Sequence, residues 1–468
     1  MTAPVTYMIE RVVIAVDTGA YDCVIKGQGN CRLDPGLQEA IESGSSELDW
    51  PTARATTGQF PVITGDTLDC GTLLAAVFAN LNVIPHIPIV TSGGAVGVDI
   101  YLQATASGSA LRGGAGTNIK IRIKKGVLVP VSLSGDPARL TYQIVADWDG
   151  TNAPITITTG QNLPAGSAGA TALWKAASIK DNTTVLSQLA GWSLDFNVGH
   201  AGNRASNSIY QSGSGVYTFA PTARFSSTDL AVMLAACGFA GKNAGTAGLI
   251  FYLAQYDADG VGVGAADAIA FTFRATVSYY YPVSTRLGQY PVSTEFAAVA
   301  IGGTAAQPPM TYGAGATLPT EAAGANLFCP GGIYDNATEV EIHGGDIAWG
   351  IAVGIERNPA LMWPDRCVVL HRQPELRIQT PDTLYHVGLS QGREIATAWN
   401  VWFRKMVSQS VQAGDASLVH VGVSIPEGRI APQEVGGAHG QIVPGSVRIL
   451  PRKGAAAILT ISTGVAIT

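Results

Sequence analysis

The chain has 468 residues, enough for about three domains of ordinary size. Only 13% of the residues are charged, the formal net charge is −6, 47% are hydrophobic and 56 are glycine. This composition excludes a disordered chain, and the negative charge disfavours tight binding to a nucleic-acid backbone. It is typical of a globular protein rich in strands and turns, and it suits a surface covered by copies of the same chain.

The first elements in chain order are two strands between residues 8 and 33, around a turn at residues 17–22. A helical turn is expected at residues 37–41. A strand, a polar turn and an apolar helix follow, and the helix ends at about Leu81. In the strand expected at residues 139–148, apolar residues alternate with polar ones, which predicts one buried face.

Two stretches rich in glycine and alanine, residues 159–170 and 302–325, are predicted to be linkers. They divide the chain into three units, residues 1–165, 166–318 and 319–468. Strands in the second and third units are expected at residues 192–198, 216–219, 250–256, 269–283, 292–301, 339–343 and 349–355, with more up to the C-terminus.

One pattern occurs once in each unit: a proline, an aspartate eight positions later, and an apolar segment after the aspartate. The six landmark residues are Pro61, Asp69, Pro221, Asp229, Pro374 and Asp382. The polar residues before each apolar segment can accept hydrogen bonds from the free N–H groups at a helix start. The third helix is the weakest, because Gly388 and Gly392 limit it.

Alternating strands at residues 119–123, 269–273 and 419–423 keep the same order and similar spacing. Such strands also arise by chance in any β-rich protein, but two landmarks in step indicate an internal repeat. The sequence therefore predicts a mainly β fold of three repeated antiparallel β-sandwich or barrel units, each with one packed helix.

The clearest enzymatic signal is Asp17-Thr18-Gly19, which follows an apolar strand. It resembles the catalytic loop of retroviral-type aspartic proteases, in which two symmetry-related carboxylates share a proton. The alternative is a polar turn between two strands. The matching places in the other units are expected at residues 181–183 and 344–346, which lack Asp-Thr-Gly. We therefore favour a turn, predict no catalytic residues, and keep the protease as the enzyme alternative.

No metal or cofactor site is predicted. The histidines and the six cysteines are scattered, without the spacing of a zinc site or a disulfide framework, and no phosphate-binding GxxxxGK[ST] motif is present. Cys70 and Cys237 are expected to be small core residues. A basic stripe follows the polar face of one strand, and a solvated face is favoured over a contact with nucleic acid or an acidic partner; it comprises Lys120, Arg122, Lys124 and Lys125.

The N-terminus has no basic region followed by an apolar core, so we expect no signal peptide. No apolar run approaches the length of a membrane span. We therefore expect a protein made in the cytoplasm and not secreted. This counts against a secreted adhesin or surface-layer protein, which the composition would otherwise suit.

The second unit carries a resemblance to a known family. A strand at residues 192–198, a long polar loop, a strand at residues 218–224 and a helix starting at residues 227–234 are similar to the order in tail tube proteins of long-tailed bacteriophages. The resemblance implies hexameric rings whose inner strands close into a β-barrel, stacked into a tube through which DNA passes without tight binding. It implies a place in the virion tail, with other copies and other tail proteins as partners. A baseplate or distal-tail component is the alternative.

The number of chains per ring depends on the third unit. Three tube-like units would let two chains close a ring of six, whereas a third unit that decorates the outside would require three chains. The weak third helix favours decoration, and so does a set of tryptophans suited to docking, at Trp349, Trp363, Trp399 and Trp402. The apolar terminal segment, residues 457–468, should pair with a strand of the same unit or of a neighbour.

Overall fold

The computed structural model describes residues 6–16, 19–23, 31–42, 53–79, 84–89, 97–105, 117–162, 173–186, 189–204, 208–230, 234, 237–238, 240–256, 262, 267–288, 290–320, 327–336, 338–382, 385, 388–389, 392–395, 397–408, 411–435, 445–454 and 457–467. This part of the chain is mainly β, and its named strands pair antiparallel. The mainly β prediction is therefore confirmed.

A long sheet runs through the whole molecule, with fifteen strands among the described residues. Twelve of them form three consecutive sets of four. The first set is β3 (Cys31–Asp34), β6 (Val62–Thr67), β11 (Arg139–Ala146) and β10 (Gly126–Ser134). The second is β15 (Leu189–Asp195), β18 (Thr222–Ser227), β23 (Ser293–Val299) and β22 (Tyr279–Arg286). The third is β27 (Gly344–Ala348), β30 (Glu375–Thr380), β36 (Gly445–Pro451) and β35 (Gly428–Val435).

The last strand of each set also pairs with one short strand that follows the helix of that set. These short strands are β7 (Ile87–Ile89) on β10, β19 (Lys242–Asn243) on β22 and β31 (Arg393–Glu394) on β35. Each short strand covers the first residues of its partner and leaves the later residues for another neighbour.

Each set is accompanied by a smaller sheet with the same pairing order. The first is β12 (Ile155–Gln161), β9 (Asn118–Ile123), β8 (Gly97–Thr105), β1 (Thr6–Val16) and β2 (Gly19–Cys23). The second is β24 (Met310–Ala316), β21 (Ala268–Phe273), β20 (Leu249–Tyr256), β13 (Leu173–Asp181) and β14 (Thr184–Leu186). The third is β37 (Thr460–Val465), β34 (His420–Ile425), β32 (Trp399–Ser408), β25 (Phe328–Asp335) and β26 (Thr338–Val340), with β33 (Val411–Gln412) added to β32.

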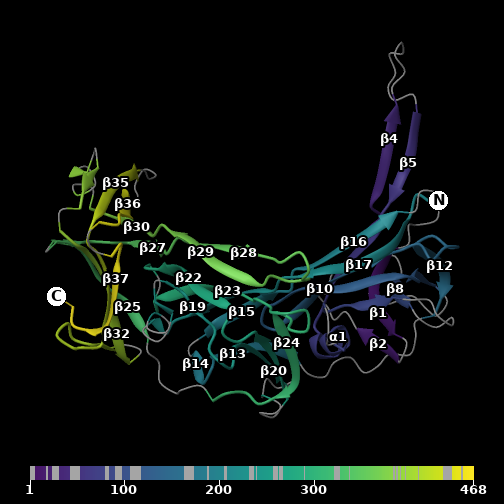
Figure 1. Cartoon of the computed structure of the whole chain (residues 1–468), viewed down its shortest axis with the longest axis horizontal. Coiled ribbons are helices and arrows are strands. Elements are labelled where there is room, and N and C mark those ends of the chain that lie inside the picture. The colour runs from purple at the N-terminus through teal and green to yellow at the C-terminus, as the bar shows by residue number, and fades with distance from the viewer. Residues whose placement is uncertain are drawn as a thin grey trace.

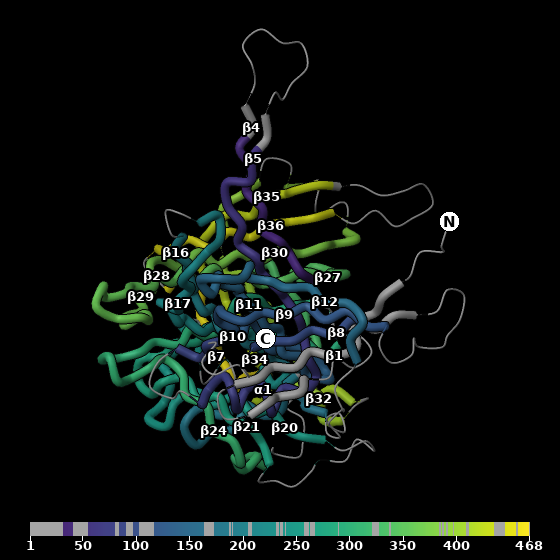
Figure 2. The backbone as a smooth tube through the Cα atoms, turned by 90° about the vertical axis from the view of Figure 1, so that its right-hand side faces the viewer, coloured from purple at the N-terminus to yellow at the C-terminus, as the bar shows by residue number. Residues whose placement is uncertain are grey.

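Each set also has a two-stranded hairpin. These hairpins are β4–β5 (Leu37–Glu42 and Ala53–Gln59), β16–β17 (Val198–Arg204 and Gln211–Phe219) and β28–β29 (Ile351–Glu356 and Arg366–Arg372). In Figure 1 the elements follow an arc, with the third set at the left and the first at the right. The β16–β17 and β28–β29 hairpins lie along the arc, whereas β4–β5 projects from its right-hand end (Figures 1 and 2).

The core lies between the long sheet and the smaller sheets. Burial alternates along β6, β18 and β30, as expected for strands with one covered face. One continuous cluster of buried side chains joins the first two sets, and a second cluster fills the third set and includes Leu230 and Leu234. The sets therefore share buried contacts across their boundaries.

Helical residues follow the second strand of each set. Helix α1 spans Cys70–Val77, and Leu230, Leu234 and Cys237 are helical in the second set. In the third set Tyr385 and Gly388 are helical. Cys70 and Cys237 are buried, and burial raises the pKa of each thiol to about 12. Both behave as core residues.

Three sequence predictions are corrected by the structure. Residues 37–41 form part of strand β4, because β5 supplies their hydrogen-bond partners. The predicted linker at residues 302–325 contains strand β24, which pairs with β21. Residues 319–468 supply β27, β30, β36 and β35 to the long sheet, which does not fit a decorating third unit. The terminal strand β37 pairs with β34 of the same unit.

The tryptophans of the third unit serve the interior of this chain. Trp349 and Trp399 are fully buried, and Trp363 is nearly so. The Trp349 indole donates a hydrogen bond to the Thr285 hydroxyl of the second set (2.9 Å). Trp402 is half-buried. The docking role expected for these tryptophans is therefore not available to Trp349 or Trp399.

Candidate functional site

The three landmark prolines occupy the same place in the long sheet. Pro61, Pro221 and Pro374 immediately precede β6, β18 and β30, the second strand of each set. The Pro61 carbonyl accepts a hydrogen bond from the Ala146 amide (3.1 Å), and the Pro221 carbonyl accepts one from the Ala300 amide (3.0 Å). Proline has no amide hydrogen to donate, so this position suits the start of a strand.

The three landmark aspartates stand where strand turns into helix. Their amides donate to the hydroxyl two residues earlier, which is Thr67 for Asp69 (3.0 Å), Ser227 for Asp229 (3.0 Å) and Thr380 for Asp382 (3.1 Å). These hydroxyl residues are almost fully buried, and sequence reasoning did not single them out. The sequence signal that could have identified them is a Ser or Thr two positions before each aspartate.

The aspartate side chains differ in what they do. The Asp382 carboxylate accepts a hydrogen bond from the Tyr385 amide (2.9 Å), whereas Asp69, the N-cap of α1, makes no side-chain capping bond. The six landmark residues therefore shape the strand–helix turn. They form no common site, since each proline–aspartate pair lies in its own set.

The feature that bears most on function is the strand pairing that joins one set to the next. Strand β10 pairs with β15, where Ser132 lies opposite Asp195. Strand β22 pairs with β27, where Ser284 lies opposite Ala348. One further bond repeats at each place: the Phe196 amide donates to the Val131 carbonyl (2.9 Å), and the Trp349 amide donates to the Val283 carbonyl (3.0 Å). We call these two places the internal joints.

A β-bulge next to a proline precedes each joint. The register of β10 shifts between Pro130 and Ser132, and that of β22 shifts between Pro282 and Ser284. Strand β35 has the same shift after Pro432. A bulge bends its strand and re-aims the residues that follow, and this frees them from the short strand beside them. These three prolines are a further repeat signal that the sequence analysis missed.

The long sheet ends in two strands with an open side. Within the described residues, β3 pairs with β6 alone. At the other end, β31 covers β35 at Arg429 and Ile430, and the strand continues past Pro432 to Val435. Thus the two strands at the free ends occupy the positions that form the internal joints elsewhere.

Hairpins fasten the joints. Asp147 of the first set is buried and accepts hydrogen bonds from the Gln211 side chain (2.7 Å) and from the Ser214 amide and hydroxyl (2.7 and 2.6 Å) of β17. The adjacent Trp148 amide donates to the Gln211 carbonyl (2.6 Å). Each later hairpin thus reaches back over the preceding set.

The β28–β29 hairpin region contacts the second set through a backbone hydrogen bond like that between Trp148 and Gln211. The Gly302 amide of the second set donates to the Pro364 carbonyl (2.7 Å), in the loop that joins β28 to β29. The Phe219 amide of β17 donates to the Met362 carbonyl (2.8 Å) of the same loop. The side chains differ, however, because Ile301 precedes Gly302 where Asp147 precedes Trp148, and Ile301 is buried.

The face of the long sheet away from the core is polar and grooved. One groove crosses β22, β27, β30, β36 and β35. A second begins at β13 of the smaller sheet, crosses the β10–β15 joint and continues over β18, β23 and β22. Carboxylates hold arginines across neighbouring strands: Asp66 with Arg139 (3.5 Å) and Glu295 with Arg224 (2.8 Å). This face therefore carries paired charges of both signs and not a basic stripe.

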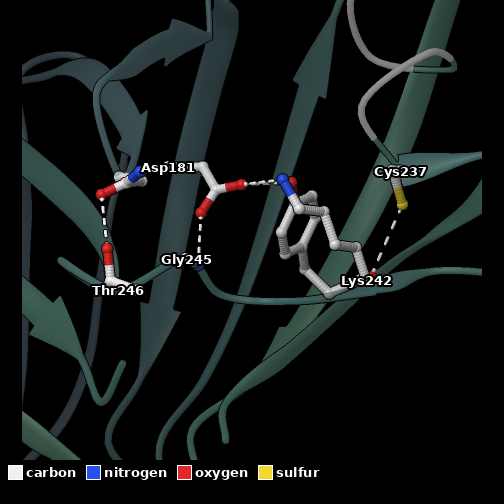
Figure 3. Close-up of polar contacts among 7 residues, drawn as sticks. Asp181, Cys237, Lys242, Gly245 and Thr246 are labelled. Atoms are coloured by element: carbon white, nitrogen blue, oxygen red, sulfur yellow. Dashed lines mark hydrogen bonds and ion pairs between the residues drawn. The ribbon is translucent and has the colours of Figure 1, made fainter. Parts of the chain in front are cut away.

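A buried carboxylate at the β13–β14 turn joins several elements of the second set (Figure 3). Asp181 accepts hydrogen bonds from the Lys242 ammonium (2.7 Å), the Gly245 amide (2.7 Å) and the Tyr280 hydroxyl (2.9 Å). Burial and the Asp181 charge raise the pKa of Tyr280. In the third set Asp335 takes the matching place and contacts Arg393 and Tyr385.

This arrangement is structural. The Asp181 oxygens receive three donors, and Lys242 stands on the short strand that covers β22. In the first set the matching short strand β7 carries Ile87, so the ion pair is not common to the three sets. Asp181 therefore fixes the short strand to the β13–β14 turn.

The structure describes the protease-like segment only in part. Asp17 and Thr18 lie outside the described residues, between β1 and β2, and Gly19 begins β2. Asn182 and Thr183 form the turn between β13 and β14. The expected third match was misplaced, because residues 344–346 belong to β27 and the corresponding turn is at Asn336.

The basic stripe along β9 and the two residues after it is partly used inside the protein. Arg122 Nε lies 3.3 Å from Asp99 Oδ1, and the Lys125 ammonium donates to the Ser212 carbonyl of β17 (2.9 Å). Burial raises the pKa of Asp99, and the nearby Arg122 charge opposes that shift. These contacts support a structural role for two of the four cations.

Within the described ranges, no group of three or more His, Cys, Asp or Glu residues is arranged to hold a metal ion. No helix in the described part of the chain is both long and apolar enough to cross a bilayer. Models of known protein families give no match to the chain, and a search of curated protein sequences gives none either.

Proposed function

We propose that this protein is a structural subunit of a bacteriophage tail tube, in which each chain supplies three tube-like units to a ring. The observation that carries the proposal is the long sheet, in which three sets of four strands follow one another through two like joints. A sheet that grows by repeating the same joint is suited to closing into a barrel, which removes its edges.

The repeat of the whole unit supports this proposal. Each set has a smaller sheet with the same pairing order, a two-stranded hairpin, helical residues after its second strand, and a short strand on its last strand. The units we propose are thus two-sheet sandwiches packed around one helix. They share cores with their neighbours, so they would act as one wall segment.

The proposed channel surface is the polar face of the long sheet. The smaller sheets cover the other face, so the grooved face is free to line a lumen. Several of its arginines are held by carboxylates, as with Arg224 and Glu295. Because unpaired cations on a protein surface generate affinity for phosphates, a surface of paired charges would let DNA pass without holding it.

Electron microscopy of the purified protein tests the proposal. We expect rings with a central hole and stacks of such rings at high protein concentration. Particles of one chain at all concentrations would refute the tube, and a single closed ring that never stacks would favour a baseplate or distal-tail component. A binding measurement with duplex DNA at physiological salt should show no tight complex.

A further inference from the structure

We propose that a second copy of this chain completes the long sheet, with β35 of each copy pairing antiparallel with β3 of the other, so that two chains close the ring. The inference rests on the proposed function for a ring of six units. It adds the partner, the two strands that meet and the number of chains.

The first argument is positional. In each internal joint the last strand of one set, β10 or β22, pairs with the first strand of the next, β15 or β27. The strands left over at the ends of the sheet are β3, a first strand, and β35, a last strand. Copies that join by the same rule form a head-to-tail contact, which closes into a ring when the rotation allows it.

The second argument is the register. Ser132 and Ser284 follow Pro130 and Pro282 by two positions, and each faces the next set. Glu434 stands two positions after Pro432 in the corresponding bulge of β35. By this rule Glu434 faces the neighbouring copy.

The residue that Glu434 meets follows from the landmark prolines. Asp195 and Ala348, the partners at the internal joints, pair with Thr222 and Glu375, which come directly after Pro221 and Pro374. Asp34 pairs with Val62, which comes directly after Pro61. Glu434 of one copy therefore lies opposite Asp34 of the other, with both side chains exposed in a single chain.

The third argument is the unused hairpin. The β16–β17 and β28–β29 regions each bind the preceding set, through Trp148 and Gly302. The β4–β5 hairpin has no preceding set in its own chain, and it projects from the end of the arc (Figures 1 and 2). In the two-chain ring this hairpin lies over the third set of the other copy.

The joint between copies has features that make it weaker than the internal joints. Pro35 stands where Phe196 and Trp349 donate their amides across the internal joints, and proline cannot donate. Glu434 and Asp34 also place two carboxylates opposite each other, whereas Ser132 faces Asp195 and Ser284 faces Ala348. Like charges directly opposite on neighbouring strands repel.

Cysteine cross-linking in the full chain tests the joint. The variant Asp34→Cys/Glu434→Cys places thiols at positions predicted to be opposite, within reach of a disulfide. After mild oxidation we expect a covalent dimer on a non-reducing gel, with no higher species. The matched variant Ser132→Cys/Asp195→Cys should form a cross-link within one chain, and the wild type and both single variants report on the native cysteines.

The outcomes separate this inference from the proposed function. A ladder of trimers and larger species would overturn closure by two chains. Rings in the microscope without a cross-link, while the matched internal variant cross-links, would overturn the β35–β3 joint and leave the tube standing. Absence of both rings and cross-links would overturn the two together.

Discussion

Glu375 of β30 and Arg448 of β36 form a bidentate ion pair on the polar face of the long sheet. Arg448 Nε donates to Glu375 Oε1 (2.7 Å), and Arg448 Nη2 donates to Oε2 (2.5 Å). Arg377 on β30 donates to the same Oε1 (2.5 Å). One carboxylate thus holds two arginines, and a paired guanidinium is less available to a passing phosphate.

Replacing Glu375 with Gln should lower the stability of the folded protein and leave both arginines without their carboxylate partner. We expect a loss of about 1 kcal/mol in the free energy of unfolding, because the pair is only partly buried and solvent screens it. Denaturant unfolding measures this loss. Glu356→Gln, at an exposed pair with Arg366 (3.6 Å), is the matched control and should change little.

The same carboxylate predicts a pH dependence. Hydrogen bonding to Arg448 lowers the pKa of Glu375 below its ordinary value of 4.5, against the effect of partial burial. A group with a depressed pKa contributes stability that is present above the unfolded-state pKa and is lost as pH falls through the folded-state pKa. The difference between wild type and Glu375→Gln should therefore shrink below about pH 4.5. A difference that grows on acidification would contradict the pairing.

The landmark aspartates should differ in their contribution to stability. Asp382→Ala removes the bond from the Tyr385 amide and should cost about 1 kcal/mol, as a lost cap does. Asp69→Ala should cost less, because Asp69 makes no side-chain capping bond. For the buried Asp229 we also expect a cost of about 1 kcal/mol. Hydrogen exchange at the helix starts measures the three effects, and equal costs for Asp69 and Asp382 would argue against the cap.

The hairpin fastening at the first internal joint depends on Asp147. Asp147→Ala leaves Gln211 and Ser214 without their acceptor, and we expect a cost of about 2–3 kcal/mol, since the site is buried. Proteolysis within β16–β17 should become faster. Asp149→Ala is the control, because the hydrogen bonds described for Asp149 go to the nearby Thr151 and Asn152 and not to the hairpin. Unchanged cleavage in Asp147→Ala would show that the hairpin is held by other contacts.

Removing the repulsion at the joint between copies should strengthen assembly. Glu434→Gln leaves one carboxylate opposite a neutral amide, and a cross-strand pair is worth about 0.2–1 kcal/mol. The ring should then persist at a protein concentration a few-fold lower, as measured by mass photometry. Glu427→Gln, whose carboxylate lies 3.9 Å from Arg452, serves as the control. Weaker assembly of Glu434→Gln would mean that Glu434 makes a favourable contact instead.

The sequence alone located the strand–helix turns and the mainly β character, because both depend on local signals. Proline at a strand start, aspartate before an apolar segment, and alternation along a strand are all readable in one short window. The strand at residues 310–316 was missed because its composition is that of a linker, and only pairing with β21 makes it a strand.

The internal joints could not be read in the same way. They pair residues from segments far apart, such as Ser132 and Asp195, and nothing local fixes that register. Pro130, Pro282 and Pro432 were visible in the sequence, but their meaning depends on the bulge that follows each of them. The short segment at residues 37–41 fits either a helical or a strand period, because five residues are too few to separate the two.

The amides of Trp148 and Gly302 donate hydrogen bonds to the two hairpin regions. The residues just before them, Asp147 and Ile301, both have buried side chains. The loop before β29 brings Met362 and Pro364 as backbone acceptors, so at Asp147 it would bury a carboxylate without donors. The donors on β17 would meet only a hydrocarbon side chain at Ile301. A hairpin that docked on the wrong set would therefore be destabilised at either place. This difference between Asp147 and Ile301 favours the correct order of the three similar segments when the chain folds.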